Sequence, residues 1–365
     1  MKLNSLSVNN FKNIQEARLE FSPSINCLLG NNGMGKSNLL DAIYYLSFAR
    51  SFSGMSDSQL VTRGNDFMML KGNYTRHGAE EEISAGFTGG KRKSFKRKSK
   101  EYQRLSDHIG MFPAVLVSPG DVDLVVGPGD ERRRLMDMVI SQGDSRYLDH
   151  LIRYQRALQQ RNKMLHEHIV DHNLYAAVEM SMAVSGEYLN KRRREWVEEL
   201  TPLFVTLYRE IAGNNETPGI TYVSHLDGST SFGNILDNAR RHDEIVGHTS
   251  VGPHRDDLQF SLDEMPARRA ASQGQCKSFT IALRLSQYDF LHRASGLMPL
   301  LLLDDIFDKL DAKRVERIVN IVGDHQRFGQ IFITDTNRDH LDSIMQLTGG
   351  DYRMWNVVDG QFTSL

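Results

Sequence analysis

A glycine-rich segment near the N-terminus has the residue types and spacing of a phosphate-binding loop. Residues 30–37 read GNNGMGKS, which matches G-x-x-x-x-G-K-S/T. Glycines let backbone amides face a phosphate with no Cβ in the way, and a following helix adds the positive end of its dipole. In such a loop Lys36 reaches the β- and γ-phosphates and Ser37 offers its hydroxyl to Mg²⁺. We therefore expect ATP and Mg²⁺ to bind at Gly30, Asn31, Asn32, Gly33, Met34, Gly35, Lys36, Ser37 and Asn38.

Two aspartates after a run of leucines are candidates for the other half of this chemistry. Leu300 to Leu303 read as a buried strand, and Asp304 and Asp305 follow directly. We expect Asp304 to hold Mg²⁺, directly or through water, and Asp305 to orient or deprotonate the attacking water. Lys36 and Asp305 are thus the predicted catalytic residues. The alternative is a loop with two solvated aspartates.

A third pattern is a polar turn before a long helical segment. Residues 271–275 read ASQGQ, and the apolar positions that follow have helical spacing. A serine and free amides at a helix start can bind an anion. An ordinary N-cap by Ser272 is the alternative.

The elements around these motifs predict an α/β domain with mixed sheets, interrupted by a mainly helical segment. Short strand patterns occupy the first thirty residues and about 67–117, and helical patterns run from about 130 to 213. We expect Thr201-Pro202 to break and restart the second long helix. Strand and helix alternate again toward the C-terminus. The predicted division is 1–120, 121–245 and 246–365, with the helical part in the middle.

Composition limits the classes that the chain can belong to. Its 365 residues carry a net charge of -2, so contacts with nucleic acid must come from local basic patches. Two cysteines suit a reducing compartment, and no apolar run is long enough to span a bilayer. The N-terminus lacks the apolar core of a signal peptide. We expect a cytoplasmic protein with no membrane partner.

These motifs together resemble the ABC-type ATPase heads of the SMC and Rad50 group. At this length the chain is most similar to the RecF family of bacterial recombination mediators. Further matches are Phe11-Lys12-Asn13, the segment 118–137 with its three arginines, and Gly252 to Leu258. The family pattern after the aspartate pair is Phe-Ser-Glu-Leu-Asp, whereas this chain reads Phe307-Asp308-Lys309-Leu310-Asp311.

The resemblance implies a homodimer that closes on ATP. The turn of one subunit, residues Ser272, Gln273, Gly274 and Gln275, would contact the γ-phosphate held by the P-loop of the other. Asp311 would form the D-loop near the dimer seam, and Lys12 and Asn13 would contact the nucleotide. The resemblance also implies binding to double-stranded and gapped DNA, weak DNA-stimulated ATP hydrolysis, and work with RecR and RecO to help load RecA in repair and replication.

A basic run is the candidate DNA contact. Residues 91–100 hold seven lysines or arginines, and the candidates are Lys91, Arg92, Lys93, Lys96, Arg97 and Lys98. The like charges of such a run repel one another unless they are solvated or paired with phosphate. A solvated hairpin is therefore the alternative to a DNA contact. For residues 191–194 a salt-bridged helix face is favoured, and for His254 a hydrogen-bonded structural role. Cys27 and Cys276 are expected in the core.

Other functions for such a head remain open at this point. A nuclease would need an acidic metal cluster beyond Asp304 and Asp305, and no such spacing occurs. A structural SMC-type DNA linker would need heptads over hundreds of residues, and here they last about twenty. Another SMC- or Rad50-like ATPase, structural or nuclease-associated, is the alternative to the RecF-type reading.

Overall fold

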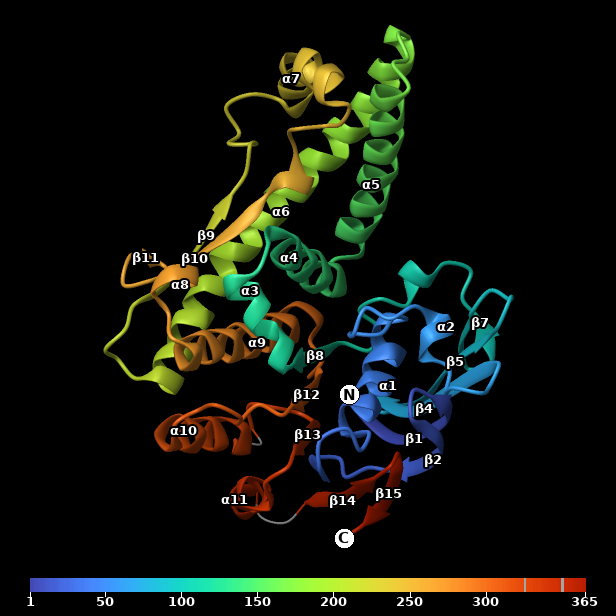
Figure 1. The fold of residues 1–365 in the computed structure, drawn as a ribbon, viewed down its shortest axis with the longest axis vertical. Helices are drawn as coiled ribbons and strands as arrows, with labels where there is room; N and C mark the ends of the chain where they lie inside the picture. The colour runs from blue at the N-terminus through green and yellow to red at the C-terminus, as the bar shows by residue number, and fades with distance from the viewer. Residues whose placement is uncertain (325, 349–350) are drawn as a thin grey trace. The chain divides into compact units, whose positions relative to one another are not determined.

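The computed structural model describes residues 1–324, 326–348 and 351–365 (Figure 1). Contacts divide the chain into two compact units. The first unit comprises Met1–Val122, Leu207–Asn214 and Ser272–Leu365. The second comprises Asp123–Thr206 and Asn215–Ala271.

The strands are β1 (Lys2–Phe11), β2 (Ile14–Glu20), β3 (Ile25–Leu29), β4 (Phe67–Arg76), β5 (Ala79–Thr88), β6 (Ser94–Arg97), β7 (Lys100–Glu101), β8 (Ala114–Val117), β9 (Pro218–Val223), β10 (Asp257–Leu262), β11 (Met265–Pro266), β12 (Leu300–Asp304), β13 (Ile331–Asp335), β14 (Tyr352–Val358) and β15 (Gln361–Ser364). The helices are α1 (Lys36–Phe48), α2 (Asp57–Leu60), α3 (Asp123–Val126), α4 (Gly129–Gly143), α5 (Ser145–His166), α6 (His172–Ala212), α7 (Phe232–Val246), α8 (Ala267–Ala270), α9 (Gln273–Ser295), α10 (Ala312–Gly323) and α11 (Arg338–Thr348). Short 3-10 helices lie at Leu105–Asp107, Pro119–Val122 and Pro253–Arg255.

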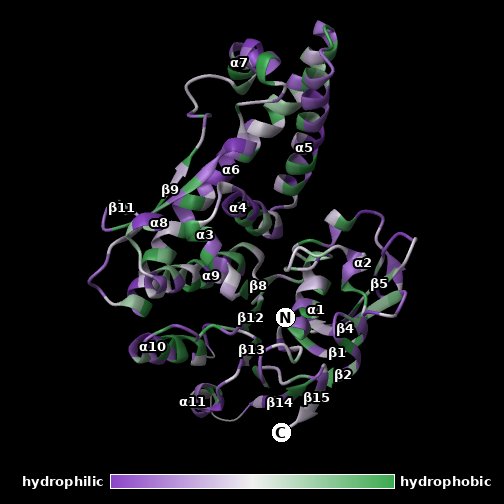
Figure 2. Ribbon diagram, viewed as in Figure 1, coloured by the Kyte–Doolittle hydropathy of each residue, from purple (hydrophilic) through white to green (hydrophobic). Residues whose placement is uncertain are grey.

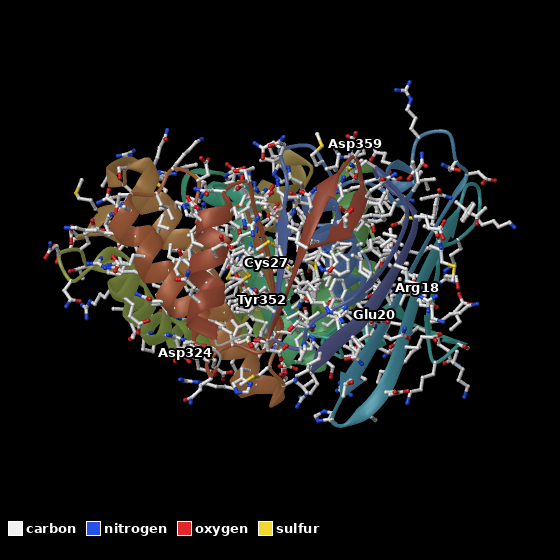
Figure 3. All side chains as sticks on the ribbon, turned by 90° about the horizontal axis from the view of Figure 1, so that it is seen from below. Arg18, Glu20, Cys27, Asp324, Tyr352 and Asp359 are labelled. Carbon is white, nitrogen blue, oxygen red and sulfur yellow. The ribbon has the colours of Figure 1, made fainter. Side chains whose placement is uncertain are left out.

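A mixed sheet forms the core of the first unit. Its order is β15-β14-β3-β13-β12-β8, with parallel pairing from β14 to β8 and antiparallel β15 at the edge. The central strands β3 and β12 are buried over nearly their whole length and are mostly apolar, because both faces of the sheet are covered. Cys27 of β3 and Tyr352 of the neighbouring β14 are labelled in Figure 3. Cys27 is fully buried, as expected.

A second sheet of the first unit has the order β2-β1-β4-β5-β6-β7 and is antiparallel throughout. Buried and exposed residues alternate along β4, so one face is packed and the other is open to solvent. Helix α1 packs against strands of both sheets and buries eleven of its thirteen residues. Helix α1, and with it the helix start that follows β3, is therefore fixed between the two sheets of the first unit.

The second unit is mainly helical, with a small sheet of order β11-β10-β9. Hydrophilic and hydrophobic residues alternate around α5 (Figure 2), which buries Tyr147, Leu151 and Met164 along one side. The expected break at Thr201-Pro202 is wrong, since α6 runs through Pro202 as one helix of 41 residues. The Thr201 hydroxyl donates to the Val197 carbonyl at 2.6 Å, and neighbouring turns hold the helix together across the missing amide.

The two compact units differ from the division expected from sequence in two main places, and one of them is that Leu207–Asn214, at the end of α6, belongs to the first unit. Residues 246–271 belong to the second unit and not to the part that carries β12. The physical reason is strand pairing, because β10 pairs with β9 over six residues from Asp257 to Leu262. An α/β fold with mixed sheets interrupted by a mainly helical part is confirmed.

Candidate nucleotide site

The predicted phosphate loop connects β3 to α1, as its pattern requires. Gly33 and Gly35 adopt positive φ angles of 82° and 111°, a conformation that costs little only for glycine. A Cβ on Gly30 would come within 2.4 Å of the Val357 carbonyl oxygen, so that position also has room only for glycine. The backbone of the loop thus requires its glycines.

The N-terminus of α1 is uncapped. Gly35 offers no side chain for the first-turn amides, and no acidic residue lies in that turn. Helices α5, α7, α9 and α10 instead have an Asp or Ser side chain that accepts from an amide in their first turn. Free amides with the positive end of the dipole form an anion site.

Lys36 lies across the loop that it follows. Its ammonium donates to the carbonyl oxygens of Gly30 at 2.6 Å and Asn31 at 3.0 Å. Burial lowers the pKa of Lys36, and the negative charges of Asp305, Asp304 and Asp335 oppose that shift. The cation is therefore held between the loop and a group of carboxylates.

Ser37 and Asp304 meet where α1 begins and β12 ends. The Ser37 hydroxyl donates to Asp304 Oδ1 at 2.7 Å, and the Thr334 hydroxyl donates to the same oxygen at 2.8 Å. Asp304 on β12 pairs in register with Thr334 on β13, which explains the contact. Burial raises the pKa of Asp304, whereas its two hydrogen bonds lower it. A hydroxyl beside a buried carboxylate is an oxygen donor set suited to Mg²⁺.

Asp305 adopts a left-handed conformation, with a φ of 48°. Such angles are uncommon outside glycine and often occur at functional sites. Its amide donates to Thr334 Oγ1 at 3.0 Å, so Thr334 bonds to both aspartates. Burial raises the pKa of Asp305, and the Asp335 charge raises it further. A carboxyl group with a raised pKa is a better proton acceptor when it is ionised.

Thr334 and Asp335 complete the group at the end of β13. Asp335 is buried at the end of β13 and pairs in register with Leu29 of β3. Its carboxylate accepts from the Asn337 amide and from His340 Nδ1, each at 2.8 Å. The parallel register places Asp335 beside the P-loop. The sequence feature that could have pointed to this position is the polar pair Thr334-Asp335 directly after an apolar run.

The residues present fit a nucleoside triphosphate with Mg²⁺. The loop offers uncapped amides and one lysine to phosphate oxygens, and Ser37 with Asp304 offers oxygen ligands to the cation. Two further predicted residues lie close by. Asn13 Oδ1 accepts from Asn38 at 2.7 Å, whereas the Lys12 ammonium pairs with the buried Asp41 at 2.6 Å.

The predicted turn at Ser272 is the N-terminus of α9. Ser272 Oγ accepts from the Gln275 amide at 3.3 Å, and Gln275 Oε1 accepts from the Ser272 amide at 2.7 Å. This reciprocal pair is a capping box. Lys277, one turn further, donates to the backbone carbonyls of Asp305 at 3.4 Å and of Asp308. The turn is thereby attached to the loop after β12 within one chain.

Asp311, the predicted D-loop residue, is the N-cap of α10. Its carboxylate accepts from the Arg314 amide at 3.0 Å, and that hydrogen bond lowers the pKa of Asp311. The Asp311 side chain is more than half exposed. It is therefore available at the surface of the first unit.

The basic run forms the hairpin from β6 to β7, and part of its charge is already paired. Lys93 lies 3.2 Å from Asp57 and donates to the Ala49 carbonyl at 2.7 Å. Arg97 makes two hydrogen bonds with Glu81, and Lys98 lies 3.4 Å from the same carboxylate. The exposed members of the run without such contacts among the described residues are Lys91, Arg92, Lys96 and Lys100.

The other predicted basic clusters are salt-bridged in the second unit. Arg132 makes a bidentate pair with Asp257, and the fully buried Arg193 bonds to Asp137 and Asp256. Arg192 pairs with Glu195, as a salt-bridged helix face predicts.

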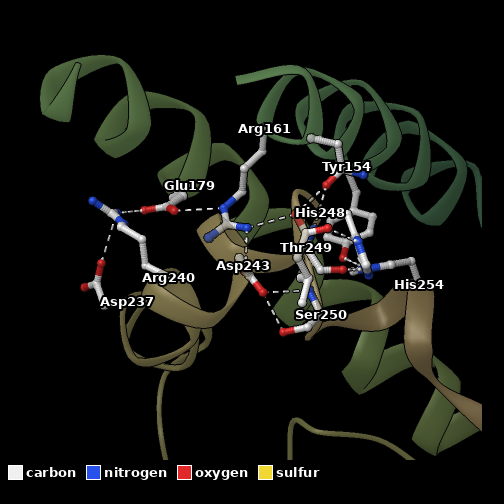
Figure 4. A network of polar contacts seen from close by, with 12 residues as sticks. Tyr154, Arg161, Glu179, Asp237, Arg240, Asp243, His248, Thr249, Ser250 and His254 are labelled. Carbon is white, nitrogen blue, oxygen red and sulfur yellow. Dashed lines mark hydrogen bonds and ion pairs between the residues drawn. The ribbon is translucent and has the colours of Figure 1, made fainter. Parts of the chain in front are cut away.

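His254 lies between the Tyr154 hydroxyl at 2.7 Å and the Thr249 carbonyl at 3.0 Å, so its structural role is confirmed. Figure 4 shows this histidine beside Thr249. Cys276 is buried, as expected.

Comparison with known proteins gives one consistent result over the whole length. The family model described as RecF/RecN/SMC N terminal domain matches residues 2–352. A protein of Phocaeicola vulgatus named DNA replication and repair protein RecF is 49% identical over 367 residues, covering 100% of this chain and 98% of its own. A protein of the same name from Parabacteroides distasonis is 47% identical over 361 residues, covering 99% and 98%.

Solved structures give the same picture. A structure of the recombination mediator protein RecF with ATPrS, in the RecFOR pathway, matches with a TM-score of 0.88 at 29% identity, covering 100% of this chain and 98% of the other. An Smc head domain from Pyrococcus furiosus matches with a TM-score of 0.60 at 17% identity, covering 100% and 96%, and supports the fold alone. Within the described ranges, no helix has the length and apolar composition needed to cross a membrane.

Proposed function

The chain belongs to the RecF family of the RecF/RecN/SMC group, and on that premise we propose that it is an ATP-dependent DNA-binding protein of replication and recombinational repair. The observation that carries the proposal is the contact between Ser37 and Asp304 beside an uncapped helix start. That arrangement suits the phosphates and the Mg²⁺ of a nucleoside triphosphate.

Each residue of the site has a part in this proposal. Backbone amides of the loop and Lys36 would bind the phosphates, and Ser37 with Asp304 would hold Mg²⁺, which would neutralise phosphate charge. Asp305 accepts a proton from the attacking water or orients it. Thr334 keeps both aspartates in place through its two hydrogen bonds. Hydrolysis is proposed to be slow and stimulated by DNA, so that ATP acts mainly as a switch.

The second half of the site is proposed to come from another copy of the chain. Residues 272–275 would contact the γ-phosphate held by the partner's P-loop, and Asp311 would lie near the seam. The capping box supports a rigid turn, because Ser272 and Gln275 are fixed by each other. ATP would therefore close a homodimer.

DNA and protein partners follow from the family premise. Relatives are named for DNA replication and repair, and a similar structure is described as a mediator in the RecFOR pathway. We propose that the closed dimer binds duplex DNA at junctions with single strands and works with RecO and RecR toward loading of RecA. A nuclease-associated or purely structural SMC-like role is the second candidate, and cleavage of linear duplex DNA by the chain would favour it.

Light scattering with and without ATP tests the dimer. Wild type is expected to double in mass with ATP, and Ser272→Arg is expected to remain monomeric while still binding ATP. Ser231→Arg is the matched control, since it removes the N-cap of α7 in the second unit. A wild-type protein that stays monomeric, or a Ser272→Arg variant that dimerises, would overturn the trans arrangement.

Turnover tests the catalytic roles. Lys36→Ala is expected to lose ATP binding, whereas Asp305→Asn is expected to keep binding and to lose nearly all hydrolysis. Isothermal titration with ATP and a phosphate-release assay measure the two properties separately. Unchanged hydrolysis in Asp305→Asn would remove that residue from the role of general base.

A further inference from the structure

A groove of about 690 Å³ lies along α5, beside the end of α7, in the second unit. Helix α5 contributes Arg156, Gln159, Gln160, Asn162, Lys163 and His166, and Gly247 after α7 completes the lining. All of these lining side chains are cationic, amide or imidazole groups, and none is a carboxylate. The groove is thus rich in hydrogen-bond donors.

The amphipathic pattern of α5 creates this surface. The helix packs through a buried side that includes Tyr154, Arg161 and Met164, and its other side is exposed to solvent. Arg156, Gln159, Gln160 and Lys163 are all exposed. Hydrophilic residues along this helix are visible in Figure 2. The buried side fixes the helix, and the exposed side carries the donors.

Asn162 is oriented by a buried network. Its Oδ1 accepts from both the amide and the hydroxyl of Thr249, at 2.8 and 2.7 Å. Thr249 Oγ1 in turn accepts from Arg161 Nη1 at 2.9 Å, and Arg161 bonds to Glu179 and Asp243 (Figure 4). With its oxygen occupied, Asn162 has its Nδ2 donors left for the groove. The orientation is fixed before any ligand arrives.

The two cations of the groove are largely free to bind an anion. Lys163 lies 3.8 Å from Glu167, and both side chains are about half exposed or more, which makes a weak pair. Arg156 has no carboxylate partner in the described part of the chain. Arginine, lysine and amide side chains are the usual protein contacts to phosphate oxygens in DNA.

We propose that this groove binds the sugar-phosphate backbone of duplex DNA. The choice of DNA rests on the proposed function, while the anion chemistry rests on the groove itself. Arg156 and Lys163 are seven residues apart, about 10 Å along a helix axis at 1.5 Å per residue. That span corresponds to about three base pairs of duplex at 3.4 Å each. The contacts would be sequence-independent, because they involve only the backbone.

Fluorescence anisotropy with a labelled duplex, at several salt concentrations and with ATP, tests the groove. Arg156→Gln with Lys163→Gln is expected to weaken binding about tenfold at 0.1 M salt and to lower the slope of log K against log salt by about 1.8, or 0.9 per contact. Asn162→Asp keeps the acceptor for Thr249 but turns an oxygen toward the groove, so it is expected to weaken binding as well. Arg156→Lys keeps the charge and is expected to bind nearly as wild type does.

The matched control is Arg134→Gln with Lys191→Gln, which removes the same charge from exposed sites on α4 and α6. An equal loss in that control would reduce the effect to net charge and overturn the groove. Groove variants with the wild-type affinity and salt slope for duplex DNA would also overturn the groove. So would groove variants that bind duplex DNA normally but no longer bind polyglutamate, a probe for acidic protein segments, because that result would assign the groove to an acidic protein segment. A wild-type chain that does not bind duplex DNA would instead contradict the proposed function itself and, with it, the choice of DNA.

Discussion

The Ser37 hydroxyl and the Asp304 carboxylate, 267 residues apart in the chain, form a hydrogen bond of 2.7 Å. The contact joins the first turn of α1 to the end of β12 across the intervening strand β13. Because a long insertion separates the two motifs, their meeting depends on the parallel sheet and not on local sequence. This is the geometry from which the nucleotide site is proposed.

Removing either partner of this bond is expected to weaken Mg²⁺-dependent ATP binding. Ser37→Ala deletes an oxygen ligand, and Asp304→Asn deletes a charge, so each should raise the Mg²⁺ concentration needed for binding by about tenfold or more. Isothermal titration with ATP over a range of Mg²⁺ concentrations measures this. Ser47→Ala on the same helix is the control, since its buried hydroxyl has no partner among the described residues. An identical Mg²⁺ requirement in Ser37→Ala would exclude the serine as a ligand.

Thr334 is expected to control turnover more than binding. Thr334→Val keeps the shape but removes the hydroxyl that donates to Asp304 and accepts from the Asp305 amide. Misplacing the proposed base is expected to reduce kcat about tenfold to a hundredfold, with KM changed less than threefold. Thr334→Ser retains the hydroxyl and should restore most of kcat. Steady-state phosphate release measures both constants, and a change confined to KM would contradict the role.

The sequence allowed prediction of the P-loop, the acidic strand end and the interrupted α/β fold, because these depend on local patterns. It did not reveal Thr334 and Asp335 as neighbours of the two aspartates, because that depends on the register between β12 and β13. Nor did local patterns show that Pro202 lies inside α6, where the surrounding turns tolerate it. For the basic run, local patterns left a DNA contact and a solvated hairpin as alternatives, and its ion pairs with Glu81 and Asp57 depend on the packing of β5 and the start of α2 against it.

The basic hairpin is expected to divide into DNA-binding and structural members. Charge reversal of the exposed Lys91, Arg92 and Lys96 should weaken duplex binding and lower the salt slope by about 0.9 for each side chain that no longer pairs with a phosphate. Arg97→Glu should instead destabilise the fold by on the order of 2 kcal/mol, because Glu81 is buried and loses its bidentate partner. Anisotropy and thermal unfolding separate the two effects. Wild-type DNA affinity in the triple reversal would identify the hairpin as a solvated surface only.

His108 is expected to make the first unit less stable in mild acid. It is fully buried between the Leu46 carbonyl at 2.7 Å and the Tyr102 hydroxyl at 3.1 Å, and burial lowers its pKa from 6.5 to about 4. Between these two values the unfolded chain binds a proton that the folded chain excludes. The free energy of unfolding should therefore fall as pH decreases from about 6.5 to about 4, by up to about 3 kcal/mol.

His108→Gln tests this titration, since glutamine can still donate to Leu46 and accept from Tyr102 but has no proton to gain. The variant should be somewhat less stable at pH 7 and should show a flatter dependence of stability on pH. Urea unfolding at a series of pH values measures the slope, and His77→Gln, at an exposed position, is the control. Part of the slope should remain, because burial also lowers the pKa of His254 in the second unit to about 4. Equal slopes in His108→Gln and wild type would show that His108 does not set the acid sensitivity.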